Sequence, residues 1–359
     1  MSKRIAIMGV GAAGSYIGAY LTKSGYDVTL IDMWGEHVDM MKREGLNVSD
    51  SDGTFTVPVN AVHLSEAEYL YSPFDIIFLA VKSYDTEWAT YFIKRFLSND
   101  GVIVSAQNCM NDGLIASIVG YERELGCVMS SITVSLWKPG YVNRKLMDLN
   151  RGMSSGKGRE YNVFRVGELH GRITSRVEEI TEILSTIDNA IATSNIWGER
   201  WSKLTTNACG NPVTAMTGLG SKSIAQDAKA RLIQIHIAKE SSVIGLASGF
   251  QIEPVQGVSA DIWSKADDGA VYEELDAILS AGEKATDWKS SMAQDVSKGR
   301  RTEIEFMNGH IVEMGRRLGI ATPINKAIVN LVQRIDSGKI EAHPSNIERV
   351  LSESGLYFQ

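Results

Sequence analysis

The sequence predicts an α/β fold in which a doubly wound parallel sheet forms the N-terminal domain and an all-helical domain follows. Strand-like and helix-like stretches alternate from the N-terminus to about residue 190, as expected for a parallel sheet covered by helices on both faces. Beyond about residue 197 the apolar residues recur at helical spacing and strand signals are few. A glycine-rich turn separates the first expected strand from the first expected helix.

The N-terminal domain is expected to consist of strands joined by crossover helices. Arg4–Met8 (RIAIM) is typical of a short buried strand, Ser15–Ser24 of a helix, and Asp27–Ile31 (DVTLI) of a second strand. Together they have the length of a parallel strand–helix–strand crossover. Further strands are expected at Phe74–Val81, Gly101–Gln107, Cys127–Ser135 and Tyr161–Glu168, and further helices at Thr86–Phe96 and Thr174–Ile187.

The C-terminal domain is expected to be helical throughout. Its clearest helical segments are Trp201–Ala215, Asp227–Ala247, Tyr272–Gly282 and Glu303–Leu318. We therefore place the first domain at residues 1–193 and the second at 194–352, and residues 353–359 resemble the remnant of a purification tag. Residues 138–160 are rich in Arg, Lys, Gly and Ser, and Met153–Gly158 (MSSGKG) is expected to be a mobile surface loop.

The composition argues against several classes of protein. The 36 Lys and Arg against 43 Asp and Glu give a formal net charge of −7, which disfavours a broad basic face for nucleic acid. Three scattered cysteines and no metal-binding spacing of histidines predict no metal site and a reducing, cytoplasmic location. No run approaches the roughly 18 apolar residues that span a membrane, and strand-like sequence from Arg4 leaves no room for a signal peptide.

The turn after the first strand has the pattern of a nicotinamide-dinucleotide site. Its residues are Gly9, Val10, Gly11, Ala12, Ala13 and Gly14, directly between a strand and a helix. In this Rossmann-type arrangement Gly9 permits the tight turn, Gly11 lets the backbone approach the pyrophosphate, and Gly14 lets helix and strand pack closely. The helix N-terminus, at Ala12 and Ala13, then offers its N–H groups and positive dipole end to the phosphates.

Asp32 bears on the choice of nucleotide. It ends the second strand, where a carboxylate accepts hydrogen bonds from the ribose hydroxyls and repels a 2′-phosphate. Read alone, it favours NAD(H) over NADP(H). The alternative is a solvated carboxylate at the end of a strand.

A polar stripe marks the candidate catalytic site in the helical domain. Lys203, Asn207 and Asn211 follow at intervals of four residues, so a helix places all three on one face. Apolar neighbours such as Trp201 indicate that much of this helix is buried, and Pro212 is expected to bend or end it near Asn211. The alternative is a solvated polar stripe, but a buried stripe of this kind requires polar partners.

These residues also resemble a known family. The segment 201–215 (WSKLTTNACGNPVTA) resembles the signature of the ketopantoate reductases, the 2-dehydropantoate 2-reductases. The same resemblance extends, in the same order along the chain, to Val81-Lys82, Gln107-Asn108, Ser290–Asp295 (SSMAQD), Arg301–Glu305 (RTEIE) and Asn308-Gly309. It covers nearly the whole chain.

The resemblance implies a reaction of pantothenate biosynthesis, in which NADPH delivers hydride to the keto carbon of a small anionic 2-oxo acid. Lys203 would be the general acid, and Glu303 would hold the substrate or Lys203 in position. Asn207, Asn211 and Ser291 would bind the substrate's hydroxyl and carboxylate groups. Lys82 and Asn108 would lie beside the cofactor.

For two of these residues the sequence also allows a structural role. Glu303 could serve the dipole of a helix that begins there, and Ser291 could be merely a polar residue at a helix start.

The sequence departs from the family pattern at three positions. Asp32 stands where the family usually carries an arginine for the 2′-phosphate, so both NADP(H) and NAD(H) stay open. Cys109 replaces the glycine after Gln-Asn, and a small buried hydrophobe is a simpler explanation of it than a redox role. Ser221 stands about where a further substrate-binding asparagine is expected.

Three hypotheses about function follow. The first is a reductase of ketopantoate or a related 2-oxo acid, and the second is an NAD-dependent dehydrogenase of another hydroxy acid on the same scaffold. The third is a non-catalytic dinucleotide sensor, against which the retained Lys203 and Glu303 argue. The sequence identifies neither the substrate's side chain nor the oligomeric state, so a homodimer is left open.

Overall fold

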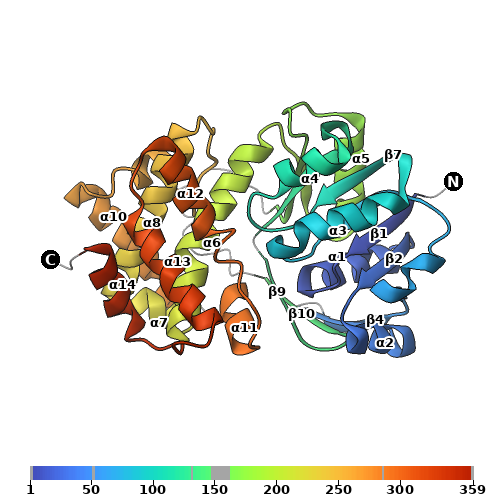
Figure 1. The fold of residues 1–359 in the computed structure, drawn as a ribbon, viewed down its shortest axis with the longest axis horizontal. Coiled ribbons are helices and arrows are strands. Elements are labelled where there is room, and N and C mark those ends of the chain that lie inside the picture. Colours follow the sequence, from blue (N-terminus) through green and yellow to red (C-terminus); the bar gives the residue numbers. More distant parts are fainter. Residues whose placement is uncertain (1–2, 51–52, 131, 147–161, 285–286, 357–359) are drawn as a thin grey trace. The chain divides into compact units, whose positions relative to one another are not determined.

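The computed structural model describes residues 3–50, 53–130, 132–146, 162–284 and 287–356. These residues form two compact units, which divide between Ile196 and Trp197 (Figure 1). The first unit holds the described residues up to 196, and the second holds those from 197 onward. The predicted loop Met153–Gly158 lies outside the described residues.

A mostly parallel sheet forms the centre of the first unit, as predicted. Among the described residues its strand order is β12-β11-β8-β7-β6-β1-β2-β5, and only β8 and β11 pair antiparallel. The strands are β1 (Arg4–Met8), β2 (Asp27–Asp32), β5 (Asn60–His63), β6 (Phe74–Leu79), β7 (Leu97–Ser105), β8 (Glu124–Met129), β11 (Phe164–Gly167) and β12 (Ala190–Ala192). Because the chain turns to β2 on one side of β1 and to β6 on the other, the carboxyl ends of β1 and β6 form a topological switch point.

Both faces of this sheet are buried, which explains why its strands are almost continuously apolar. Ile5 and Ile7 of β1 face a core shared with α1, α2 and α5, whereas Ala6 and Met8 face a core shared with α3 and α4. The helices are α1 (Ala12–Lys23), α2 (Gly35–Glu44), α3 (Thr86–Ile93), α4 (Asp112–Val119) and α5 (Ser175–Ser185). Short 3₁₀ segments lie at Leu64–Tyr69, Ser83–Asp85, Lys94–Phe96 and Tyr121–Arg123.

A second, four-stranded sheet packs against the α1 side and was not predicted. Its order is β4-β3-β10-β9, with β3 (Leu46–Asp50), β4 (Gly53–Val57), β9 (Ile132–Lys138) and β10 (Tyr141–Leu146). The single strand predicted at Cys127–Ser135 is therefore wrong, because β8 ends at Met129 and β9 belongs to the other sheet. Strand β10 occupies part of the segment 138–160, whose polar composition concealed a half-exposed strand.

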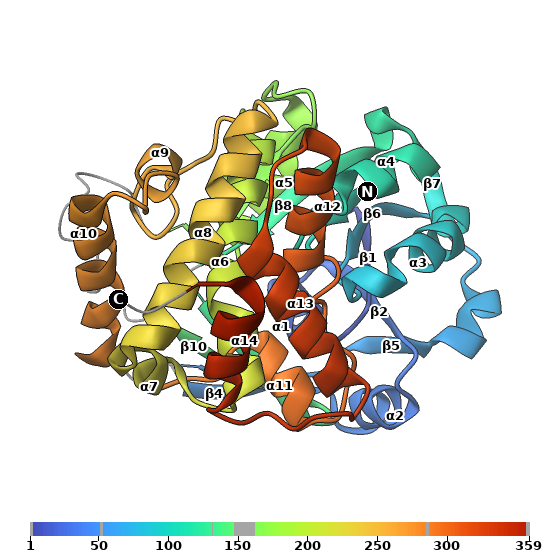
Figure 2. The ribbon, with the colours of Figure 1, turned by 60° about the vertical axis from the view of Figure 1, so that its left-hand side comes forward.

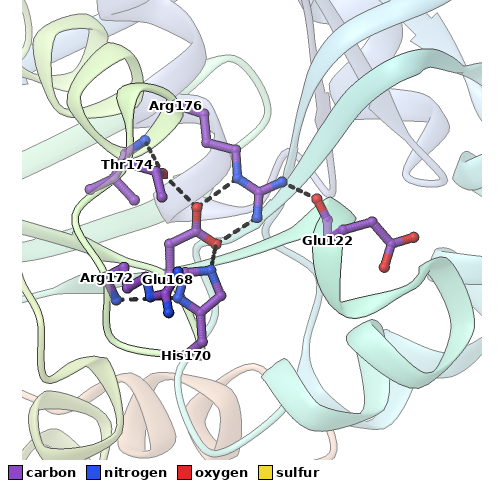
Figure 3. Close-up of polar contacts among 7 residues, drawn as sticks. Glu122, Glu168, His170, Arg172, Thr174 and Arg176 are labelled. Carbon is purple, nitrogen blue, oxygen red and sulfur yellow. Dashed lines mark hydrogen bonds and ion pairs between the residues drawn. The ribbon is translucent and has the colours of Figure 1, made fainter.

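A buried ion pair fixes the turn between β11 and α5 (Figure 3). The Glu168 carboxylate, 1% exposed, accepts hydrogen bonds from Arg176 Nε at 2.7 Å, Arg176 Nη2 at 2.5 Å and Thr174 Oγ1 at 2.6 Å. Burial alone would raise the pKa of Glu168, but the hydrogen bonds and charge of Arg176 outweigh it and lower that pKa. Arg176 also donates to the Glu122 carbonyl, so it ties α5 to the segment before β8.

The second unit is helical in its described residues, as predicted. Its helices are α6 (Ile196–Thr217), α7 (Ser221–Gln226), α8 (Ala228–Ala247), α9 (Ala260–Trp263), α10 (Gly269–Ser280), α11 (Ser291–Ser297), α12 (Asn308–Leu318), α13 (Pro323–Asp336) and α14 (Asn346–Ser354), with a 3₁₀ segment at Ala281–Lys284. Figure 2 shows α8 at the centre of this unit, and it contacts α9, α10, α12, α13 and α14. No helix in the described part of the chain is long and apolar enough to cross a membrane.

The helix predicted from Glu303 is wrong at its start, because α12 begins only at Asn308. Thr302 donates from its N–H and its hydroxyl to the Asp336 carboxylate, at 3.2 and 2.7 Å. This anchor at the end of α13 holds residues 303–307 as turns in place of a first helical turn.

Candidate active site

The glycine turn has three glycines in three different environments. Gly9 has φ +92°, and a Cβ there would lie 2.6 Å from the Val81 nitrogen. A Cβ on Gly14 would lie 2.0 Å from the Gly9 oxygen, whereas one on Gly11 would meet no atom within 4 Å. Gly9 and Gly14 are thus required by the fold itself, and Gly11 leaves open space at the start of α1.

That open space meets the N-terminus of α1. Gly11 is the N-cap and supplies no side-chain cap, and Ser15 N–H makes a helical hydrogen bond to the Gly11 oxygen at 2.9 Å. The N–H groups of Ala12, Ala13 and Gly14 precede that bond, and such N–H groups with the helix dipole favour an anion. The turn therefore fits the pyrophosphate of a dinucleotide.

Asp32 is held by the backbone around this turn. Its Oδ2 accepts the N–H of Val10 at 2.5 Å, and its Oδ1 accepts the N–H of Trp34 at 2.8 Å. The nearest basic residues along the chain are committed elsewhere, because Lys42 pairs with Glu66 at 2.6 Å and Arg43 with Glu44 at 3.1 Å.

A buried histidine that sequence reasoning missed supports the same turn. His37 Nδ1 accepts the N–H of Gly140 at 2.9 Å, so the ring proton lies on Nε2, which is 3.2 Å from Ser15 Oγ. Ser15 Oγ in turn donates to the Val10 oxygen at 2.9 Å. Burial lowers the pKa of His37, although the charge of Asp32 opposes it. His37 and Gly140 are 103 residues apart in the chain, so no local pattern could reveal this contact.

Lys82 and Asn108 follow the strands next to β1. Lys82 comes after β6, and Asn108 comes after β7. The side chain of Gln107 joins these two chain segments, since its Nε2 donates to the Val81 oxygen and to Thr86 Oγ1, both at 2.8 Å. The carboxyl ends of three adjacent parallel strands therefore bring the glycine turn, Lys82 and Asn108 to one edge of the sheet.

Cys109 adopts a left-handed backbone conformation. It has φ +66° and is buried. A non-glycine residue pays a steric cost there, which gives a physical reason why the family pattern has glycine at this position.

The stripe Lys203, Asn207 and Asn211 lies on α6. Lys203 and Asn207 are half-buried and Asn211 is buried. Pro212 does not end the helix, which continues to Thr217. The stripe's helix is joined to α8, where Ser241 accepts hydrogen bonds through its backbone oxygen from Trp201 Nε1 at 3.0 Å and lies with its hydroxyl 2.7 Å from Thr205 Oγ1.

Glu303 is buried, 5% exposed, in the turn before α12. The same segment reaches α6 through Asn308, whose Nδ2 donates to the Ala208 oxygen at 3.1 Å. Ala208 follows Asn207 directly. The carboxylate of Glu303 thus belongs to a segment anchored to the helix that carries the stripe.

The segment of Ser291 also meets α6, but through its neighbour. Ser291 is exposed, whereas Ser290 is buried and donates from Oγ to the Asn211 oxygen at 3.2 Å. Ser221 has a structural engagement, because its Oγ accepts the N–H of Trp288 at 3.2 Å. The described residues contain no group of His, Cys, Asp and Glu side chains that could hold a metal.

Comparison with known proteins identifies the family. A family model described as Ketopantoate reductase PanE/ApbA matches residues 5–149, and one described as its C-terminal part matches residues 195–336. The chain belongs to the ketopantoate reductase family. Both the dinucleotide turn and the Lys203 stripe fall inside the matched ranges, so this is a family of oxidoreductases to which both halves of the candidate site belong.

Individual relatives agree with this family assignment. The 2-dehydropantoate 2-reductase of Archaeoglobus fulgidus is 29% identical over 94% of this chain and 99% of its own. The solved 2-dehydropantoate 2-reductase of Geobacter metallireducens GS-15 is 26% identical with TM-score 0.75, over 92% of this chain and 99% of its own. A D-mandelate dehydrogenase solved with NADH and anilino(oxo)acetate shares the fold, with 23% identity and TM-score 0.76, over 93% and 98% of the two chains.

Proposed function

We propose that this protein reduces ketopantoate or a related small 2-oxo acid to the 2-hydroxy acid, with NAD(P)H as the reductant. The observation that carries the proposal is the composition of the stripe on α6. One amine, Lys203, and two carboxamides, Asn207 and Asn211, share a helix face that is half-buried or buried. A buried carboxylate, Glu303, belongs to a segment bonded to the same helix.

Each of these groups suits one part of a keto acid. The reduced nicotinamide, when bound, supplies the hydride that the keto carbon gains. Lys203 donates a hydrogen bond to the keto oxygen and then the proton that this oxygen needs to become a hydroxyl. Asn207, Asn211 and Ser291 hydrogen-bond the substrate's carboxylate and hydroxyl groups, and Glu303 holds the substrate or Lys203 in place. Lys82 and Asn108 contact the cofactor.

For the nucleotide, we propose a preference for NAD(H). The carboxylate of Asp32 is fixed at the end of β2 by two backbone N–H groups. A 2′-phosphate beside it would meet negative charge, and the basic side chains that follow on α2, Lys42 and Arg43, are already paired with carboxylates.

The test is a steady-state assay of cofactor oxidation with ketopantoate and a series of smaller and larger 2-oxo acids, each with NADH and with NADPH. We expect turnover with at least one 2-oxo acid and a higher kcat/KM with NADH than with NADPH. A better kcat/KM for hydroxy-acid oxidation on a different substrate would favour the dehydrogenase hypothesis. Tight dinucleotide binding without turnover in either direction would contradict the proposal and favour a sensor.

A further inference from the structure

Pro212 leaves a gap in the hydrogen bonding of α6 at the centre of the polar stripe. Proline has no N–H, so the carbonyl four residues earlier, that of Ala208, loses its helical donor, and the proline ring also crowds it. The helix nonetheless continues through Pro212 to Thr217. Ala208 lies between Asn207 and Asn211, so the interrupted turn is the one that separates the two carboxamides.

A side chain from another helix supplies the missing donor. Asn308, the first residue of α12, is fully buried, and its Nδ2 donates to the Ala208 oxygen at 3.1 Å. The same Nδ2 also donates to Asn325 Oδ1 at 2.9 Å. A carboxamide nitrogen carries two N–H bonds, so both hydrogens of Asn308 have an acceptor.

The orientation of Asn308 is set by a chain of buried groups behind it. Asn325 Nδ2 donates to Glu240 Oε2 at 2.7 Å, and the Glu240 carboxylate also accepts the N–H groups of Ile324 and Asn325 at 3.0 Å each. An ionised carboxylate only accepts hydrogen bonds. Glu240 therefore turns the nitrogen of Asn325 toward itself and its oxygen toward Asn308, and this leaves the nitrogen of Asn308 for Ala208.

We propose that Asn308 is a positioning residue that replaces the hydrogen bond lost at Pro212 and thereby sets the spacing of Asn207 and Asn211 for substrate binding. The inference rests on the proposed function for its kinetic part. Its hydrogen-bond part rests on the geometry of α6, α8, α12 and α13 alone, all within the second unit.

The test is a double-mutant cycle of Asn308→Ala and Pro212→Ala. In the Pro212→Ala protein, residue 212 regains an N–H that can bond to the Ala208 oxygen, so the amide of Asn308 becomes redundant. We expect Asn308→Ala alone to raise KM for the 2-oxo acid about tenfold, with a smaller change in kcat. In the Pro212→Ala background the same change should raise KM no more than about twofold. Dinucleotide affinity should stay unchanged in all four proteins.

Asn346→Ala is the matched control. Asn346 is also buried, and its Nδ2 donates to the Met216 oxygen of α6 at 2.8 Å, but beyond the stripe. It should lower the thermal midpoint without raising KM. An equal rise in KM from Asn308→Ala in both backgrounds, or from Asn346→Ala, would overturn the inference.

Thermal midpoints of the four proteins of the cycle require no substrate. Additive midpoint shifts would refute the replacement of the Pro212 hydrogen bond, whether or not the reaction is found. If the wild-type protein reduces no 2-oxo acid, the proposed function and the kinetic part of the inference fail together. Non-additive midpoints would then support the hydrogen-bond part alone.

Discussion

At the scale of the residue, Cys109 is a backbone position where glycine would be less strained. Its φ of +66° costs an L-residue about 1–2 kcal/mol. The comparison of Cys109→Gly with Cys109→Ala isolates this cost, because both remove the buried thiol and only glycine removes the strain. We expect the glycine variant to be the more stable by about 1 kcal/mol in chemical denaturation. Alanine being equal or better would show that the left-handed conformation is not strained here.

His37 makes a prediction about pH. Because burial lowers its pKa below the ordinary 6.5, the unfolded chain binds the proton more tightly, and folding stability falls as pH drops below 6.5. Protonation would also remove the acceptor for the Gly140 N–H. Asparagine does not titrate and keeps an acceptor oxygen near Nδ1. Acidification should therefore lower the melting temperature of the wild type more than that of His37→Asn, and equal slopes would contradict the role given to His37.

Single residues also show where sequence reasoning stops. The roles of Gly9, Gly11 and Gly14 as turn, opening and close contact could be predicted, because they follow from backbone geometry within one short segment. His37 and Ser290 could not, because their partners Gly140 and Asn211 are distant in the chain. Nothing in the spacing of these residues distinguishes them from ordinary polar side chains.

At the scale of the element, the turn from β11 to α5 depends on Glu168 and Arg176. Arg176→Met would leave the buried carboxylate without its cation, and we expect a loss of about 3 kcal/mol, the low end of the range for broken buried pairs because the guanidinium is 26% exposed. Chemical denaturation at pH 7 measures this loss. The double variant Glu168→Gln/Arg176→Met should recover part of it, and an equal loss in both would refute the account of the ion pair.

The same pair predicts a pH dependence with a definite sign. The pKa of Glu168 is lowered in the folded state, so its contribution is present above the ordinary value of 4.5 and is lost as pH falls through the lowered pKa. The stability difference between wild type and Glu168→Gln should therefore be largest at neutral pH and shrink toward acid. A difference independent of pH would contradict the assigned shift.

Elements were predictable where the chain's local pattern and its burial agree. The strands of the main sheet are apolar because both faces are covered, and α6 and α8 have long helical periodicity. The second sheet was missed because β3 pairs with β10 from a distant part of the chain, and its strands are short and partly exposed. The start of α12 was misplaced because a tertiary contact, Thr302 with Asp336, overrides the local helical pattern.

At the scale of the whole molecule, the two units carry different parts of the proposed reaction. The first unit offers the dinucleotide turn, and the second offers the amine, carboxamides and carboxylate of α6 and its anchored segments. The fold and the family could be predicted from the sequence because their motifs recur in order along the chain. The side chain of the substrate could not, because it depends on the shape of a pocket rather than on any motif.

The most direct test of the account is the turnover of Lys203→Ala with the best 2-oxo acid found for the wild-type protein. Loss of a general acid should lower kcat by on the order of 100-fold or more, while dinucleotide affinity stays unchanged. Lys229→Ala is the matched control, because Lys229 is exposed and pairs with Glu348 at 2.5 Å on the surface of the same unit. Wild-type turnover in Lys203→Ala would contradict the central claim that this protein is a 2-oxo acid reductase with Lys203 as its proton donor.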